Sequence, residues 1–302
     1  MSLTQSTLPP KKVKIGPKHV GDKEPCFVIA EIGINHNGDL NFAKKLIDVG
    51  AQSGADAVKF QKRTVDVVYT PEELARPREN PFGPTNGDLK RGLEFGYDEY
   101  REIDRYCKEK NILWLTSCWD EKSVDFMEQF NPPCYKIASA SLTDAGLLKH
   151  TCATKKPLII STGMSTLDEI RKAVDLVHSF LGENFVLLHC VSTYPAENHE
   201  LNLLGILKLR ELFKVLVGYS GHEKGIAPSV MAAVLGACVI ERHITLDRAM
   251  WGTDQAASLE PPGFGRLIRD IRVWEEAKGT GEKVVLPSEV PILKKLRRVD
   301  TL

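Results

Sequence analysis

The run Phe27-Val-Ile-Ala-Glu-Ile-Gly33 is apolar almost throughout and carries a single carboxylate, Glu31, near its end. Runs of the same kind recur along the chain, at residues 57–61, 113–117, 135–139, 158–162, 185–190, 215–220 and 238–245. Most of them are continuous in apolar residues rather than alternating with polar ones, which is typical of parallel strands covered on both faces. We therefore expect eight buried parallel β-strands.

Helical patterns fill most of the gaps between these runs. Ser165-Thr-Leu-Asp168 predicts a helix start, with an N-cap and an acidic residue three positions later, and Gly182 stands where that helix should end. Residues 264–277 predict the last helix, with an apolar face. Strands that alternate with helices predict an α/β protein of the (β/α)8 TIM-barrel type. No Gly-x-Gly-x-x-Gly follows the first strand, which disfavours a doubly wound dinucleotide-binding sheet.

The length of 302 residues suits one barrel. We expect the barrel and an N-terminal extension to occupy residues 1–278, and a C-terminal linker or docking tail to occupy residues 279–302. An insertion at about residues 63–97, rich in Pro, Gly, Asn and charge, follows the second strand. It should therefore begin on the C-terminal face of the barrel, where it is either a lid or a packing loop.

Composition excludes some classes of partner. Lys and Arg together number 40, as do Asp and Glu, so neither nucleic acid nor a membrane surface is indicated. No apolar run approaches the roughly 18 residues of a membrane span, and residues 1–13 lack the apolar core of a secretory signal. The seven cysteines contain no Cys-x-x-Cys pair and lie mostly in or beside apolar runs. They indicate reduced, buried thiols in a cytoplasmic protein.

Polar residues stand at the ends of the predicted strands, which converge on one mouth of a barrel of this type. They are Glu31, Asn35, His36, Lys59, Gln61, Thr116, Ser117, Lys136, Ser139, Ser161, Thr162, His189, Ser192, Tyr194, Tyr219, Ser220, His222, Glu241, His243, Thr245 and, a little further on, Asp254. Burying each such group without a partner would cost roughly 1–3 kcal/mol. A polar mouth that holds a ligand is therefore the favoured interpretation.

Lys59 and Lys136 lie inside apolar runs, although parallel barrel strands have no face toward solvent. Each lysine could bind an anionic ligand, pair with a carboxylate or form a Schiff base, and anion binding is the favoured of the three. Together with Ser139, Ser161 and Thr162, the two ammonium groups would suit a phosphate plus a carboxylate.

His222 and His243 end neighbouring strands, whose spacing is about 5 Å. Two imidazoles at that separation can share one divalent cation, although a single histidine is more often structural. Glu31 and Asp254 lie near them by topology. Two nitrogen ligands would leave coordination positions open for Lewis-acid chemistry, so we expect a metal site here.

Nine short motifs, which touch nearly every strand between about residues 14 and 300, together resemble the N-acetylneuraminate (sialic acid) synthase family. They are Ile29-Ala-Glu-Ile-Gly-Ile-Asn-His-Asn-Gly38, Val58-Lys-Phe-Gln61, Tyr135-Lys-Ile-Ala-Ser139, Ser161-Thr-Gly-Met164, His189-Cys-Val-Ser-Thr-Tyr-Pro195, Gly218-Tyr-Ser-Gly-His-Glu223, Glu241-Arg-His-Ile-Thr245, Gly252-Thr-Asp254 and Ala257-Ser-Leu-Glu-Pro261. Each motif alone is weak, whereas the set is specific.

The resemblance implies a transferase of sialic acid biosynthesis that condenses phosphoenolpyruvate with N-acetylmannosamine or its 6-phosphate. A divalent cation, manganese or magnesium, would be held by His222 and His243. Catalytic roles would fall to Glu31, Lys59, Lys136 and Asp254. Substrate contacts would come from Gln61, Ser117, Ser139, Ser161, Thr162, Ser192, Tyr194 and Ser220. The alternatives are a synthase for pseudaminic or legionaminic acid, a synthase for a deoxy-octulosonate or deoxy-heptulosonate phosphate, and a non-catalytic sugar-binding barrel.

Two departures from the family pattern bear on the substrate. Relatives commonly carry a C-terminal antifreeze-like domain, which reaches into the partner subunit of a homodimer with an arginine. This chain stops at Arg297-Arg-Val-Asp-Thr-Leu302, about where that domain would begin, so it is either a truncated form or a barrel-only branch. Arg76, Arg78, Arg297 and Arg298 are then candidates to replace the arginine. Ser192 also stands where some relatives have asparagine.

Overall fold

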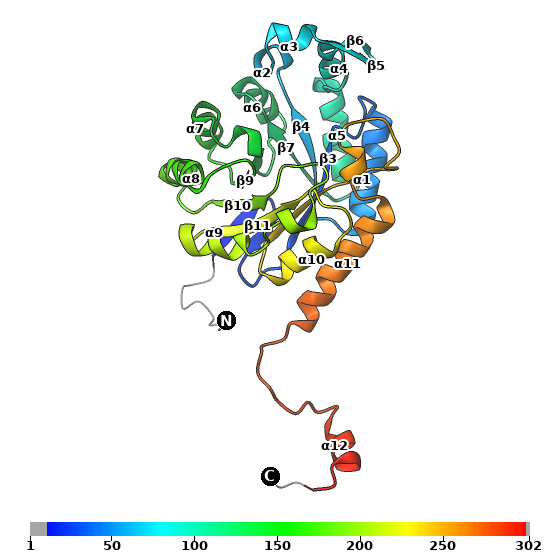
Figure 1. The fold of residues 1–302 in the computed structure, drawn as a ribbon, viewed down its shortest axis with the longest axis vertical. Coiled ribbons are helices and arrows are strands. Elements are labelled where there is room, and N and C mark those ends of the chain that lie inside the picture. The colour runs from blue at the N-terminus through cyan, green and yellow to red at the C-terminus, as the bar shows by residue number, and fades with distance from the viewer. Residues whose placement is uncertain (1–10, 300–302) are drawn as a thin grey trace.

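The computed structural model describes residues 11–299, and its centre is a closed barrel of parallel strands (Figure 1). In order around the barrel the strands are β3 (Phe27–Gly33), β4 (Ala57–Lys62), β7 (Leu113–Cys118), β8 (Tyr135–Ile137), β9 (Leu158–Ser161), β10 (Phe185–Cys190), β11 (Leu216–Gly221) and β12 (Val239–His243). β12 pairs with β3 and closes the ring. The predicted (β/α)8 barrel is therefore confirmed, with each expected strand in place.

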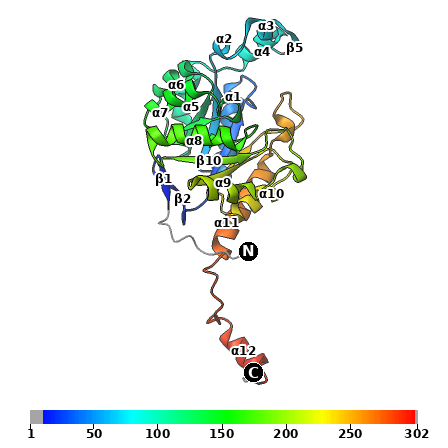
Figure 2. The same cartoon turned by 60° about the vertical axis from the view of Figure 1, so that its left-hand side comes forward.

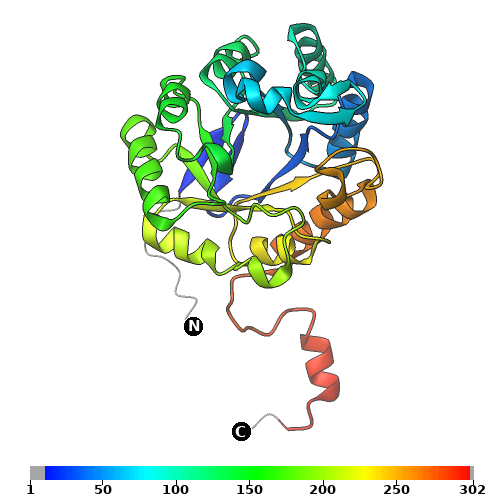
Figure 3. The ribbon, with the colours of Figure 1, turned by 45° about the horizontal axis from the view of Figure 1, so that its top comes forward.

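Helices form a ring outside the barrel (Figure 3). They are α1 (Leu40–Ser53), α5 (Tyr97–Glu109), α6 (Glu121–Glu128), α7 (Ala145–Ala153), α8 (Leu167–Leu181), α9 (Gly205–Phe213), α10 (Ala227–Val234) and α11 (Pro261–Ala277). The predicted N-cap of α8 was one residue early: Thr166 caps the helix, in a reciprocal capping box with Glu169. α11 begins at Pro261 rather than at residue 264, because proline is well suited to the first turn of a helix.

A hairpin of two short strands closes the N-terminal end of the barrel. β1 (Lys12–Ile15) pairs antiparallel with β2 (Lys18–Gly21). Val13, Ile15 and Val20 pack there against the inward side chains of the barrel strands and are fully or almost fully buried. Each such burial contributes about 1.5–3 kcal/mol. The interior of the barrel at its N-terminal end is therefore an apolar core. The polar side chains lie at the C-terminal ends of the strands.

The insertion after β4 is built of short regular elements that stand over the C-terminal side of the barrel (Figures 1 and 2). They are α2 (Val65–Val68), α3 (Pro71–Ala75), β5 (Pro77–Asn80), β6 (Gly83–Thr85) and α4 (Asn86–Gly92). Capping boxes at Thr70 and Thr85 begin α3 and α4. Phe82, in the β5–β6 turn, lies on Gly92, where an added Cβ would come 2.2 Å from the phenyl ring.

Beyond α11 the chain leaves the barrel. Residues 278–289 contain no helix or strand, and α12 (Val290–Leu296) projects away from the rest of the molecule (Figure 1). The expected division at residues 278 and 279 stays a prediction, and residues 1–10 of the expected N-terminal extension lie outside the described residues. Within residues 11–299 no helix combines the length and apolarity that crossing a membrane requires.

Candidate active site

A cavity of about 220 Å³ opens at the C-terminal ends of the barrel strands. It is lined by twelve of the fourteen predicted site residues: Glu31, Lys59, Gln61, Ser117, Lys136, Ser139, Ser161, Ser192, Tyr194, Ser220, His222 and His243. Trp119, Met164, Cys190 and Glu241 also line it. The barrel thus brings most of the predicted set to one place, from all eight strands or from the loops that follow them.

Two predicted residues do not line this cavity. The hydroxyl of Thr162 donates a hydrogen bond to the Leu188 carbonyl, at 2.9 Å, because Thr162 and Ser161 are consecutive and point to opposite sides of the chain. Asp254 lies behind His243, with its Oδ2 4.0 Å from the imidazole Nδ1. The Thr162 side chain is therefore hydrogen-bonded to the neighbouring strand β10. The Asp254 carboxylate faces His243, a predicted metal ligand, rather than the cavity.

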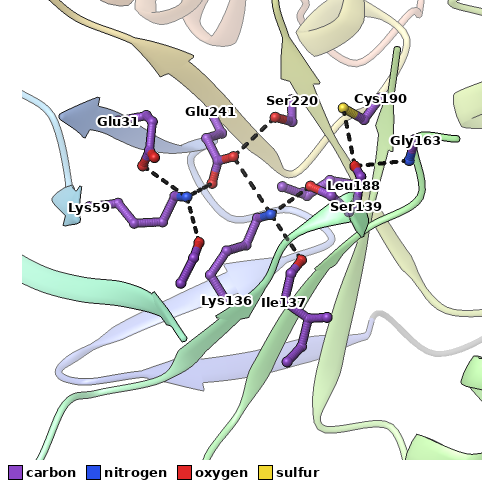
Figure 4. A network of polar contacts seen from close by, with 12 residues as sticks. Glu31, Lys59, Lys136, Ile137, Ser139, Gly163, Leu188, Cys190, Ser220 and Glu241 are labelled. Carbon is purple, nitrogen blue, oxygen red and sulfur yellow. Dashed lines mark hydrogen bonds and ion pairs between the residues drawn. The ribbon is translucent and has the colours of Figure 1, made fainter. Parts of the chain in front are cut away.

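Four buried charges, two of each sign, form the floor of the site (Figure 4). Lys59 Nζ lies 2.8 Å from Glu31 Oε2 and 3.5 Å from Glu241 Oε2, and it donates to Ser117 Oγ at 2.9 Å. Lys136 Nζ lies 3.7 Å from Glu241 Oε1. The carboxylate pairing that the sequence left as an alternative is therefore present for both lysines, and it does not exclude a role in anion binding.

Lys136 has weaker partners than Lys59. Its Nζ donates to the Ser161 hydroxyl at 2.6 Å and to the backbone carbonyl of Ile137 at 3.1 Å (Figure 4). The nearest carboxylate, that of Glu241, lies beyond hydrogen-bond distance and accepts instead from Ser220 Oγ at 3.0 Å. Neither Glu31 Oε2 nor Glu241 Oε2 accepts a well-directed hydrogen bond. The cluster is balanced in charge but incompletely hydrogen-bonded.

The two carboxyl groups differ in proton affinity. Burial raises the pKa of Glu31, and Lys59 only partly offsets it. Burial acts in the same sense on Glu241, but Lys136 and Lys59 together outweigh it and hold the pKa of Glu241 down, to about 2. Glu241 is therefore an ionised anchor for the lysines, whereas Glu31 is the carboxyl that most readily takes up a proton. Burial also lowers the pKa of Lys136, an ammonium that an anion would stabilise.

Close packing at Gly163 gathers the hydroxyl groups beside Lys136. The Gly163 N–H donates to Ser139 Oγ at 3.1 Å, and Ser139 Oγ contacts Cys190 Sγ at 3.7 Å (Figure 4). A Cβ on Gly163 would lie 2.2 Å from the hydroxyl oxygen of Ser192 and 2.8 Å from that of Ser139. Glycine here therefore lets two hydroxyl groups line the same wall of the cavity, next to an ammonium.

The imidazoles of His222 and His243 face each other, with ring centroids 5.5 Å apart. His222 Nδ1 lies 2.7 Å from the Val191 carbonyl and donates to it, so that in the neutral ring the lone pair is on Nε2. His243 Nδ1 is buried and has no hydrogen-bond partner. Burial, only partly opposed by Asp254, lowers the pKa of His243 to about 3, so this ring is neutral at physiological pH.

These donors fit a divalent cation as a two-histidine ligand set. Each ring offers one nitrogen for ligation: Nε2 of His222 and Nδ1 of His243 have no hydrogen-bond partner among the described residues, and ligation requires such a nitrogen in its unprotonated form. Among residues 11–299 no group of three or more His, Cys, Asp or Glu side chains is placed to hold a metal ion. The two imidazoles would therefore leave most coordination positions to substrate or water, which is the arrangement expected of a catalytic rather than a structural metal.

Glu241 is the residue whose role the sequence did not reveal. It stood among the polar strand ends, yet nothing marked it as the partner of both lysines. One signal was present: Glu241 and His243 are two positions apart on β12, as Lys59 and Gln61 are on β4, and strand alternation puts such pairs on one side of the barrel wall.

The chain is similar to known proteins along most of its length. A family model described as the NeuB family matches residues 46–283. N-acetylneuraminate-9-phosphate synthase of Homo sapiens is 42% identical over 280 residues, which cover 92% of this chain and 78% of the human protein. N,N'-diacetyllegionaminic acid synthase of Legionella pneumophila is 38% identical over 294 residues, which cover 95% of this chain and 83% of that protein. The solved structure of the N-acetylneuraminic acid synthetase from Leptospira borgpetersenii serovar Hardjo-bovis, in complex with citrate, has a TM-score of 0.83 at 29% identity and covers 96% of this chain and 99% of its own.

Proposed function

Since this chain belongs to the NeuB family, as the sequence motifs predicted, we propose that it joins phosphoenolpyruvate to N-acetylmannosamine or to its 6-phosphate. The products are N-acetylneuraminate or its 9-phosphate, together with inorganic phosphate. At the coarser level the family and its synthases already make the chain a phosphoenolpyruvate-dependent sugar synthase, which is a carbon–carbon bond-forming transferase.

The observation that carries the proposal is the pair of buried ammonium groups on one small polar cavity. Lys59 and Lys136 are about 3% and 2% exposed. Phosphoenolpyruvate bears a carboxylate and a phosphate on the same carbon, C2, so it needs two neighbouring cations with hydroxyl donors beside them. Ser139 and Ser161 supply such donors next to Lys136. We assign the phosphate to the Lys136 side, because that ammonium has the weaker carboxylate partner.

The reaction forms one carbon–carbon bond and breaks one carbon–oxygen bond. C3 of phosphoenolpyruvate attacks the aldehyde carbon of the sugar, whose oxygen takes up a proton. Water adds at C2 and loses one proton. Phosphate then leaves with cleavage of its bond to C2, while the new C2 hydroxyl gives its remaining proton to the phosphate and becomes the carbonyl. One carboxyl group can supply the first proton and accept the second. Glu31 suits this role because its pKa is raised by burial, whereas Glu241 stays ionised and holds Lys59 and Lys136 in place.

His222 and His243 would hold the divalent cation, manganese or magnesium, beside Glu31. When bound, the cation polarises the sugar aldehyde as a Lewis acid. The Val191 carbonyl fixes the orientation of the His222 ring, and the carboxylate of Asp254 faces His243. Tyr194, with its ring centroid 4.1 Å from that of His222, covers the same side of the cavity and orients the sugar there.

A phosphate-release assay tests the proposal. The full chain is incubated with phosphoenolpyruvate, manganese and a panel of aldoses, and the mass of each product is measured. The proposal expects release with N-acetylmannosamine or its 6-phosphate and a product of the corresponding mass. Release only with a diacetylated bacterial aldose would favour the second candidate, a legionaminic acid synthase, which the 38% identity to the Legionella protein supports. No release with any aldose would favour a non-catalytic barrel.

We also propose that the chain acts as a homodimer in the cytoplasm. The homodimer follows the family pattern, and light scattering on the purified protein would test it. All seven cysteines are buried and unpaired, as expected in a reducing compartment. Localisation of a tagged full-length protein would test the second part.

A further inference from the structure

A second cavity, of about 280 Å³, lies between the insertion and the loop that follows β12. The insertion contributes Arg78, Leu89 and Lys90 to its lining, and the loop contributes Trp251 and Thr253. The two walls are in contact: the aromatic ring of Phe82 in the insertion packs edge to face on that of Trp251, with ring centroids 6.5 Å apart. The cavity is therefore a defined space between two structured segments rather than an open surface.

This cavity lies close to the catalytic mouth, because two consecutive residues, Thr253 and Asp254, connect them. Thr253 lines the cavity, and its hydroxyl donates at 2.8 Å to the carboxylate of Asp254, which faces His243. The loop is held in position by Asn37, whose side-chain amide donates to the Trp251 carbonyl at 2.9 Å. Asp254 therefore stands between the two histidines and this cavity.

Two cations on the cavity have no ion-pair partner among residues 11–299. Arg78 donates to the amide oxygen of Asn86 at 3.2 Å, and Lys90 Nζ lies 4.9 Å from the ring centroid of Tyr69. The neighbouring arginines differ: Arg91 pairs with Asp66, and Arg63 pairs with Glu94. Burial, together with Arg63 and Arg78, lowers the pKa of Lys90, so an anion at this place would stabilise its charged form.

We propose that this cavity receives the end of the acceptor sugar that is remote from its aldehyde, and that Arg78 and Lys90 give preference to an aldose that carries a phosphate monoester at that end. The inference rests on the proposed synthase function and selects between its two acceptor sugars. A phosphate monoester brings up to two negative charges and three acceptor oxygens. Trp251 and Leu89 would contact the sugar carbons.

An uncharged substituent, such as an acyl group, suits this cavity less well. It would fill the space beside Leu89 but would leave the half-buried Lys90 without an anionic partner, which is costly. Among the described lining residues Arg78 and Lys90 outnumber the one carboxylate, Glu79, which is exposed to solvent, as Arg78 is. The charge of the lining therefore favours an anion.

The test compares kcat/KM for N-acetylmannosamine 6-phosphate and for N-acetylmannosamine, with phosphoenolpyruvate and manganese saturating. The full chain should prefer the phosphorylated sugar. The double variant Lys90→Met with Arg78→Met should lower the ratio of the two kcat/KM values by about tenfold to a hundredfold, the worth of a hydrogen bond to a charged group. The charge-keeping double variant Lys90→Arg with Arg78→Lys should retain most of the preference.

A matched control removes one lysine and one arginine elsewhere. Lys172→Met with Arg101→Met changes exposed positions on α8 and α5 and should leave the ratio as in the unmodified chain. Equal kcat/KM for both sugars in the unmodified chain would overturn the inference, and so would an unchanged ratio in the Lys90 and Arg78 double variant. In both cases the synthase function would stand. Release of phosphate with neither sugar would instead overturn the proposed function, and this inference with it.

Discussion

Glu241 and Arg242 are neighbours on β12, yet they belong to two different buried charge clusters. One lies outside the barrel wall and is enclosed, and the other lies inside it and lines the cavity. Arg242 points outward to α10 and is enclosed: its guanidinium donates to Glu223 Oε1 at 2.8 Å, to Ser229 Oγ at 2.9 Å and to two backbone carbonyls. Glu223 also accepts from Tyr219 and Ser229. Glu241 points inward, where its Oε1 accepts from Ser220 Oγ and its Oε2 accepts no well-directed hydrogen bond.

The difference separates a structural cluster from a functional one. The outer pair is fully buried and satisfies nearly every polar atom, so it has nothing to offer a ligand. The inner cluster keeps two ammonium groups on an open cavity, and the carboxylate nearest to Lys136 lies 3.7 Å from its Nζ, beyond hydrogen-bond distance. Buried cations that line a cavity rather than a closed core indicate a site that an anion completes. Removing charge should therefore cost stability at the outer pair and activity at the inner cluster.

The largest expected effect is on stability, at the outer pair. Arg242→Met leaves the Glu223 carboxylate buried without its cation and should lower the free energy of unfolding by about 3–5 kcal/mol. Urea unfolding at neutral pH measures this change. Adding Glu223→Leu should restore much of the loss, because the buried charge is then removed as well. A single variant as stable as the unmodified chain would show that the outer pair is not structural.

The next effect concerns the two histidines. Chelation with EDTA should lower phosphate release by at least about a hundredfold, since electrostatic stabilisation of the developing charge is lost, and manganese should restore it. His243→Ala should abolish the restoration and should weaken manganese binding in calorimetry, while the thermal unfolding midpoint stays close to that of the unmodified chain. Full turnover in verified metal-free protein would refute a metal role at this mouth.

A smaller effect is expected in the pH dependence of stability, through Glu241 of the inner cluster. The folded-state pKa of Glu241, about 2, lies below its ordinary value of 4.5. This carboxylate therefore contributes stability above about pH 4.5, and the contribution is lost as pH falls toward 2. Between pH 7 and pH 3 the loss should be on the order of 2 kcal/mol. In Glu241→Gln, urea unfolding should show a correspondingly flatter acid limb, and equal slopes for the two proteins would contradict the assignment.

The smallest expected effect lies in the insertion. If it acts as a lid, hydrogen exchange in residues 63–97 should slow when phosphoenolpyruvate and the acceptor sugar are both present, because both cavities lie beneath or beside it. Exchange in α9, which follows β10 on the side of the barrel opposite β4, serves as the reference. An unchanged profile in the insertion would favour the packing role.

Much of this fold could be predicted from the sequence, because continuous apolar runs and helical periodicity reflect local physics. The runs located every barrel strand, and the polar residue at each strand end indicated the mouth. Thr162 could have been excluded from the cavity, since strand alternation turns it away from Ser161. The capping signals Thr70-x-x-Glu73 and Thr85-x-x-Asp88 could also have revealed α3 and α4 within the insertion.

The rest depended on contacts between distant segments. No local pattern states that Glu241 lies between Lys59 and Lys136, because the pairing depends on the register of five strands. The cavity at Lys90 likewise needs the insertion and the loop at Trp251, about 160 residues apart in the chain, to meet. Sequence patterns place residues on elements, whereas charge balance becomes visible only once the elements are packed.

Titration calorimetry with phosphoenolpyruvate tests the central claim, that the two ammonium groups of the inner cluster face the cavity and bind this anion. Lys136→Met is the decisive variant, because Lys59 retains Glu31 and Glu241 without it. We predict that the dissociation constant for phosphoenolpyruvate rises by about a hundredfold or more, while the free energy of unfolding falls by less than in Arg242→Met, because Glu241 keeps Lys59 as a partner. An unchanged dissociation constant, or a loss of stability as large as that in Arg242→Met, would contradict the account.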